Sequence, residues 1–112
     1  MVGHVFAGLP ASDFRASAAW YERLVGRPPD LRPNEDEAAW RLTDTGWIYV
    51  VEDAGRAGNA LLTVLVEDLE THVAELAARG LATQPIEIVP EVGRKAAIAD
   101  PDGNLVTFAE AD

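Results

Sequence analysis

Residues 100 to 110 decide the fold and read Asp100-Pro101-Asp102-Gly103-Asn104-Leu105-Val106-Thr107-Phe108-Ala109-Glu110. Proline fixes φ at the second position of a turn and glycine accepts a positive φ, so the first four residues predict a tight hairpin corner. The residues after it alternate, with Leu105, Thr107 and Ala109 on one face and Val106 and Phe108 on the other. This pattern predicts a half-buried strand whose second face looks onto something other than the main core.

The size and composition are those of one compact domain over residues 1–112, with a core that is marginal without a partner subunit. No apolar run approaches the ~20 residues that a membrane span needs. The start, Met1-Val2-Gly3-His4, has neither the basic segment nor the long apolar segment of a signal peptide. The absence of cysteine excludes disulfides and thiolate ligands. We therefore expect a cytoplasmic protein with no membrane partner.

The charge is strongly acidic, because nine basic residues stand against nineteen acidic ones for a net charge of −10. A surface of this sign repels phosphate backbones, so we expect no nucleic-acid partner. The excess can serve solubility, or it can attract cationic small molecules.

The sequence of the first half of the chain predicts one strand, one helix and three more strands. Residues 4–9 form the first strand, and Ser12 or Asp13 caps a helix over 13–25 that ends at Gly26. Short strands are expected near residues 29–33, 37–43 and 46–52.

The same order then repeats after a polar linker at residues 54–59. A strand over 60–66 leads into a helix capped by Glu67-Asp68 and ended by Gly80, and three strands follow near 83–89, 93–99 and 104–110. Superposing Asp13 on Asp68 gives an offset of 55 residues. The sequence therefore predicts an α+β fold of two tandem βαβββ units, residues 1–53 and 59–112.

Three motifs in this order resemble the vicinal oxygen chelate superfamily, the glyoxalase/bleomycin-resistance/dioxygenase group. They are Ala11-Ser12-Asp13-Phe14 with the helix through Gly26, Val66-Glu67-Asp68-Leu69, and Asp100-Pro101-Asp102-Gly103-Asn104. The resemblance implies a cup-shaped mixed sheet in which two units face each other across a cavity. A homodimer is expected, with the cavity between units of two chains, although pairing of the two units within one chain stays open.

Enzymes of this superfamily hold a divalent metal at four strand positions. The resemblance places these positions at Phe6, Leu61, Thr107 and one of Tyr49, Val50 and Val51. None of these side chains is a usual ligand for a divalent ion, apart from an occasional tyrosine. We therefore expect no metal and no cofactor, and we find no catalytic set.

The remaining polar residues are weak substitutes for the missing metal ligands. His4 shares a strand face with Phe6, Glu52 flanks the fourth position, and Glu110 is expected to be a solvated terminal residue. His72 is expected to be exposed on its helix. Arg94 and Lys95 are expected to carry surface charge, although one could point to the cavity.

The expected ligand-binding surface of the cup is apolar and aromatic. Its residues are Phe6, Trp40, Trp47, Tyr49, Leu61, Thr63 and Thr107, joined by Leu65 and Leu105 as aliphatic lining. Trp47 and Tyr49 should line the cup while Ile48 and Val50 face the helix. Aromatic rings would stack on a flat or cationic ligand.

Three functions remain open. The first is a metal-free small-molecule-binding protein like the bleomycin-resistance branch, which sequesters an aromatic or cationic antibiotic-like ligand in a dimer-interface cavity. The second is a divalent-metal-dependent lyase or dioxygenase with a non-standard site of His4, a carboxylate and a tyrosine. The third is a dimerisation or regulatory module whose cup is filled by its own side chains.

Overall fold

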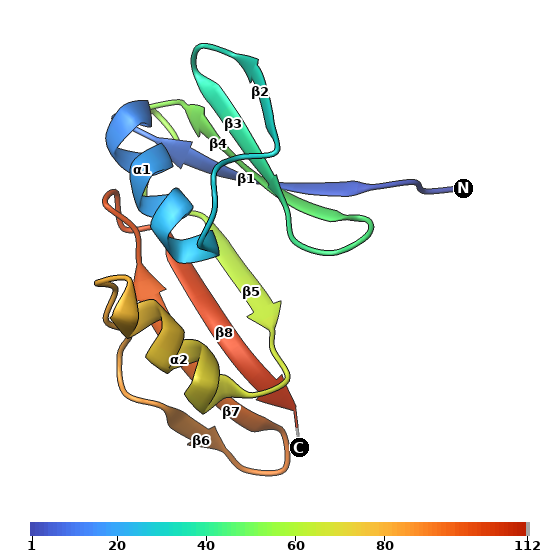
Figure 1. Cartoon of the computed structure of the whole chain (residues 1–112), viewed down its shortest axis with the longest axis vertical. Helices are drawn as coiled ribbons and strands as arrows, with labels where there is room; N and C mark the ends of the chain where they lie inside the picture. Colours follow the sequence, from blue (N-terminus) through green and yellow to red (C-terminus); the bar gives the residue numbers. More distant parts are fainter. Residues whose placement is uncertain (112) are drawn as a thin grey trace.

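The computed structural model describes residues 1–111 and consists of two helices and two four-stranded sheets (Figure 1). The first unit contains β1 (Val5–Ala11), α1 (Phe14–Val25), β2 (Leu31–Asn34), β3 (Glu37–Arg41) and β4 (Gly46–Glu52). The second unit contains β5 (Leu61–Leu65), α2 (Leu69–Ala78), β6 (Glu87–Val89), β7 (Gly93–Ala99) and β8 (Leu105–Ala111). The predicted α+β fold of two βαβββ units is confirmed. Residue 112, which the prediction included in the second unit, lies outside the described residues.

Both sheets have the same topology. Their strand orders are β1-β4-β3-β2 and β5-β8-β7-β6. The first strand of each unit runs parallel to the last, and the other pairs are antiparallel. One helix packs on one face of each sheet, α1 on β3 and β4 and α2 on β7 and β8. We call the opposite face of each sheet its cup face.

The helix starts follow the predicted repeat. The side chain of Asp13 accepts a hydrogen bond from Ala16 N at 3.2 Å, and that of Asp68 accepts one from Thr71 N at 3.1 Å. These bonds satisfy amide groups that have no partner inside the helix. The offset of 55 residues between the two caps therefore reflects a structural repeat.

An arginine at the C-terminal end of each helix donates hydrogen bonds to the end of the other helix. Arg23 of α1 donates to the carbonyls of Arg79 and Gly80, both at 3.1 Å. Arg79, the C-cap residue of α2, donates to the carbonyls of Arg23 at 2.5 Å and Leu24 at 2.9 Å. Carbonyl groups at a helix C-terminus carry partial negative charge, so each guanidinium stabilises the end of the other helix. This reciprocal pair joins the two units on their helix side.

The Asp100–Asn104 turn also joins the two units. Asn104 is fully buried, and its Nδ2 donates to the Pro10 carbonyl and to Asp100 Oδ2, both at 2.8 Å. Its Oδ1 accepts from the backbone N–H groups of Gly58 and Ala60 at 3.0 Å. The predicted hairpin corner is confirmed, with a bond from Gly103 N to the Asp100 carbonyl. It is also a connection between β1, the linker and the second sheet.

The described part of the chain has no helix that is long and apolar enough to cross a membrane.

Candidate functional site

The cup faces of both sheets are uncovered in the single chain. Phe6 is 47% exposed on β1, and Leu61 and Leu65 are 82% and 73% exposed on β5. β1 and β5 are the edge strands of separate sheets and do not pair with each other. The side chains of residues 1–111 therefore do not fill the cup of the single chain.

The first cup face carries an aromatic platform. The rings of Phe6 and Trp47, which are neighbours in the parallel register of β1 and β4, stack with centroids 5.1 Å apart and planes 21° apart. Trp47 Nε1 donates to His4 Nδ1 at 3.1 Å, which fixes the orientation of the indole. The ring of Tyr49 lies over Gly8, because a Cβ at Gly8 would come within 2.7 Å of the Tyr49 hydroxyl. These three rings give the first cup face an aromatic surface on which a flat ligand can stack.

The two faces of β4 are as predicted, whereas the placement of Trp40 on the cup is wrong. Ile48 and Val50 are buried against the helix side, while Trp47 and Tyr49 are half-buried on the cup face. Trp40, however, is 0% exposed and lies in the core, where its Nε1 donates to the Arg27 carbonyl at 2.9 Å. The register pairs Trp40 with Ile48, and directly paired residues share a sheet face. That pairing could have placed Trp40 correctly from the sequence.

The second cup face is aliphatic with two hydroxyl groups. Thr63 on β5 pairs with Thr107 on β8, so their side chains are neighbours on the sheet, with Leu61, Leu65 and Leu105 around them. Within residues 1–111 neither threonine hydroxyl has a hydrogen-bond partner. A groove of about 280 Å³ between the two units has Trp47 and Thr63 among its lining residues.

Sequence reasoning missed two charged residues of the first cup face. Arg41 pairs with Trp47 and Glu37 pairs with Val51, so both lie on the same face as the aromatic platform. Strand alternation from Trp40 would have found them once Trp40 was assigned to the core.

The positions that hold a metal in superfamily enzymes do not form a ligand set here. Phe6 and Leu61 offer no donor atom, and Val50 faces the core, which leaves Tyr49 or Val51 as the fourth position. No group of three His, Cys, Asp or Glu within residues 1–111 could hold a metal ion. The donor chemistry therefore does not fit a divalent metal at this site.

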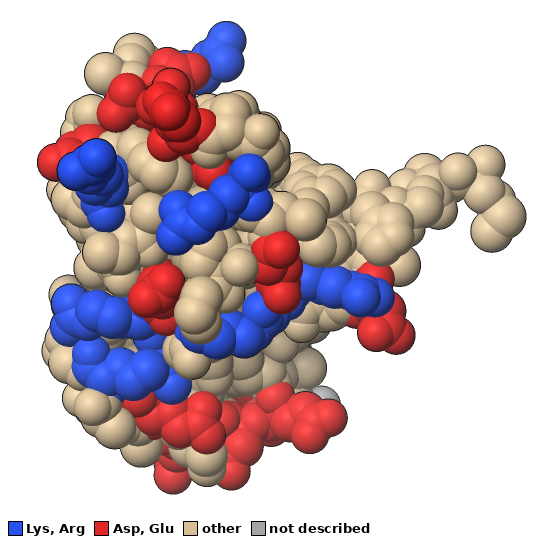
Figure 2. All heavy atoms as spheres, turned by 45° about the horizontal axis from the view of Figure 1, so that its top comes forward, with Lys and Arg blue, Asp and Glu red and all other residues tan. Residues whose placement is uncertain are grey.

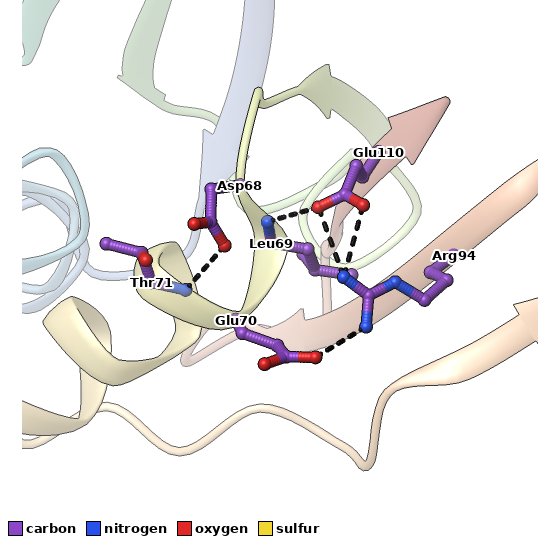
Figure 3. A network of polar contacts seen from close by, with 6 residues as sticks. All are labelled: Asp68, Leu69, Glu70, Thr71, Arg94 and Glu110. Carbon is purple, nitrogen blue, oxygen red and sulfur yellow. Dashed lines mark hydrogen bonds and ion pairs between the residues drawn. The ribbon is translucent and has the colours of Figure 1, made fainter. Parts of the chain in front are cut away.

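The two carboxylates that could have replaced the missing metal ligands face the helix side of their sheets. Glu52 accepts a hydrogen bond from Phe14 N at 3.4 Å, and Glu110 accepts one from Leu69 N at 2.7 Å (Figure 3). In each unit, one of these carboxylates therefore accepts a hydrogen bond from the first backbone N–H of the helix. His4 is bound to Trp47 on the cup face, so the structure does not bring the non-standard set together.

The expectation of a solvated Glu110 is wrong, and the partly exposed Arg94 pairs with it. Arg94 Nη2 lies 3.1 Å and 3.2 Å from the two oxygens of Glu110, and its Nη1 lies 2.7 Å from Glu70 on α2 (Figure 3). The Leu69 N–H and then the Arg94 guanidinium hold the pKa of Glu110 below its usual value. Lys95 points the other way, to the cup face, where its Nζ lies 4.0 Å from Glu87. Only Lys95 of this pair thus reaches the cup.

The expectation of an exposed His72 is also wrong. Its ring lies 4.3 Å from that of Phe108, and its Nε2 is buried without a hydrogen-bond partner. His72 follows Leu69 by three residues and so shares the buried stripe of α2. Burial lowers the pKa of His72, and a groove of about 360 Å³ between the units runs past it on the helix side. His72 therefore lies on the helix side of the second sheet and does not line its cup face.

Comparisons with known proteins agree with the fold. The chain belongs to the family described as the glyoxalase-like domain, whose model matches residues 5–109. This confirms membership of the glyoxalase/bleomycin-resistance group. A search of curated proteins finds no match.

Several solved structures share the whole architecture. A glyoxalase/bleomycin resistance protein from Catenulispora acidiphila is 37% identical with a TM-score of 0.92, and the match covers 97% of this chain and 98% of that one. An antibiotic-binding protein from a Streptomyces species is 23% identical with a TM-score of 0.78 over 97% and 95% of the two chains. A bleomycin-binding protein complexed with bleomycin is 22% identical with a TM-score of 0.78 over 97% and 98%. The last two likenesses show the fold.

Proposed function

We propose that this protein binds an aromatic small molecule in its cup without a metal ion, and that it sequesters that molecule rather than transforming it. The observation that carries the proposal is the uncovered aromatic platform of Phe6, Trp47 and Tyr49 on a sheet whose metal positions hold non-ligating side chains. The antibiotic-binding and bleomycin-binding structures with the same fold support it.

We further propose that a second copy of the chain completes the cup. Leu61 and Leu65 expose apolar side chains on an edge strand, and Phe6 does the same on the edge strand of the other sheet. Unpaired edges and contiguous apolar surface favour association. The reciprocal arginines and the Asn104 bonds fix the two units of one chain against each other, which supports pairing between chains rather than within one.

A thermal-shift screen of aromatic compounds tests the binding function. A ligand at one hundred times its dissociation constant stabilises the native state by about 2.7 kcal/mol. The shift should disappear in Trp47→Leu and persist in Trp20→Leu, because Trp20 lies on α1 against Tyr21, on the helix side. A shift that survives in Trp47→Leu would contradict the proposed site.

Leu65→Lys tests the partner surface. Placing a charge at this exposed position should shift the protein toward monomer in sedimentation analysis, with little change in monomer stability. Asp44→Lys, at an exposed turn, is the control and should leave the association state unchanged. Equal sedimentation of the wild type and Leu65→Lys would contradict association through this face.

A further inference from the structure

The two cup faces together carry no net charge, in contrast to the rest of the molecule. The charged side chains on their strands are Glu37 and Arg41 in the first unit and Glu87 and Lys95 in the second. Two carboxylates and two cations sum to zero, whereas the whole chain carries −10. The acidic excess of the described residues therefore lies outside the cup faces.

The acidic groups gather elsewhere. Figure 2 shows that acidic side chains are densest at the top and bottom of one face of the molecule, whereas most of the basic side chains lie between, interspersed with further acidic ones. Glu52 and Glu110 are directed to helix amides, and Glu70 to Arg94. The carboxylates of these residues are therefore not placed to receive a cationic ligand in the cup.

The cation on the strand beside the platform has a carboxylate partner. Arg41 pairs with Trp47 in the register of β3 and β4, and its guanidinium is directed to the carbonyls of Thr43 at 3.2 Å and Asp44 at 2.8 Å. The Asp44 carboxylate lies 3.9 Å from Arg41 Nη2, so the pair supplies no net charge that would attract a cationic ligand to the indole. A cation that gave up its water to reach the rings would therefore find no compensating charge here, although the rings alone would suit a cation–π contact.

The polar groups that remain on the cup faces are neutral hydroxyls. Thr63 and Thr107 stand on adjacent strands, which lie about 4.8 Å apart. Each hydroxyl can donate one hydrogen bond and accept others, and neither is used within residues 1–111. An oxygen-bearing ligand could satisfy both at once on an otherwise aliphatic surface.

We infer that the cup selects an uncharged, flat aromatic molecule that bears carbonyl or hydroxyl oxygen, and discriminates against aromatic cations. The Phe6–Trp47 stack holds the ring system, and the Thr63–Thr107 pair bonds the oxygen. This inference rests on the proposed binding function and decides between the neutral and the cationic ligand. The acidic surface then serves solubility, and ligand capture does not depend on attraction of opposite charges.

Two tricyclic fluorescent probes of the same shape test the inference, acridone as the neutral ketone and 9-aminoacridine as the cation at pH 7.5. Titration of the full chain should give an affinity for acridone at least about tenfold higher than that for 9-aminoacridine, with little dependence on salt. Thr63→Val with Thr107→Val removes both hydroxyls at constant shape and should weaken acridone binding about tenfold. Thr83→Val, outside the cup, should leave it unchanged.

The outcomes separate the inference from the function on which it rests. Tighter binding of 9-aminoacridine, abolished by Trp47→Leu, overturns the neutral-ligand inference and leaves the binding function standing. Acridone binding that is unaffected by the double threonine variant overturns the role of the hydroxyl pair. Binding of neither probe, or binding that Trp47→Leu does not weaken, overturns the proposed site and the inference together.

Discussion

The hydroxyl of Tyr21 donates a hydrogen bond to Asp100 Oδ2 at 2.8 Å, across 79 residues of sequence. Tyr21 belongs to α1 of the first unit, and Asp100 begins the turn before β8 of the second. Burial first, and then the charge of Asp100, raise the pKa of Tyr21 far above its usual value, so the phenol stays a donor. Asp100 Oδ1 accepts from the backbone N–H groups of Asp102 and Asn104. The turn is thus anchored to the first unit by a buried polar network.

Tyr21→Phe should lower the free energy of unfolding by about 1.5–3 kcal/mol, because a hydrogen bond to a buried carboxylate is lost while the ring is kept. Urea unfolding at pH 7 measures the change. Tyr49→Phe is the control, since the Tyr49 hydroxyl lies on the cup face; its effect should stay below about 0.5 kcal/mol. Equal stability of the Tyr21→Phe variant and the wild type would show that this bond does not join the units.

Arg79→Lys should destabilise the protein by about 0.5–1.5 kcal/mol, because a lysine cannot reach the carbonyls of Arg23 and Leu24 with a planar fork. Combination with Arg23→Lys should cost less than the sum of the two single changes, since each arginine supports the other's helix end. A double-mutant cycle in urea measures this coupling. Arg56→Lys, at an exposed loop pair, is the control. Strict additivity would contradict a reciprocal pair.

Acid should weaken the attachment of α2 through Glu110. The pKa of this carboxyl is lowered by the Leu69 N–H and then by Arg94, so the unfolded chain binds its proton more readily. Its contribution to stability is therefore complete above the unfolded value of 4.5 and is lost as the pH falls through the lower folded value. Glu110→Gln should reduce stability at pH 7 and flatten the loss between pH 4.5 and pH 3.

Urea midpoints measured from pH 3 to pH 7 check this prediction. Glu67→Gln, an exposed residue before α2, provides the matched control. If stability decreased equally steeply at acid pH in Glu110→Gln and in the wild type, the assigned role of Glu110 would be contradicted.

Gly8→Ala should disturb the platform more than the fold. The new Cβ would lie 2.7 Å from the ring end of Tyr49, so the tyrosine must turn away. We expect a several-fold loss of acridone affinity with a stability cost of about 1–1.5 kcal/mol. Gly55→Ala, where the nearest atom is 3.6 Å away, should change neither. Unaltered acridone affinity in Gly8→Ala would remove Tyr49 from the binding surface.

The fold could be predicted from the sequence because local signals and the repeat agree. Asp13 and Asp68 cap their helices, Gly26 takes the positive φ of 87° expected at a helix end, and residues 105–109 alternate as predicted. Such signals act over a few residues, so they can be read without knowledge of tertiary contacts.

The site could be predicted only in part, because its polar contacts span long distances in sequence. Glu110 lies 41 residues from Leu69, and no local pattern indicates that a carboxylate near the end of the chain caps a helix amide. The apolar residues of α2 alone do not show that the polar His72 shares their buried stripe. The aromatic residues of the β3–β4 hairpin look alike in the sequence, whereas the register assigns Trp40 and Trp47 to opposite faces.

Native mass spectrometry of the protein with acridone tests the central claim, that two chains together form a metal-free cup for a neutral aromatic ligand. The account predicts a species of twice the 12.0 kDa chain mass that carries acridone and no metal ion, and loss of the bound acridone in Trp47→Leu. A single chain that carries acridone, or a ligand-bound dimer that also retains a stoichiometric divalent ion, would contradict it.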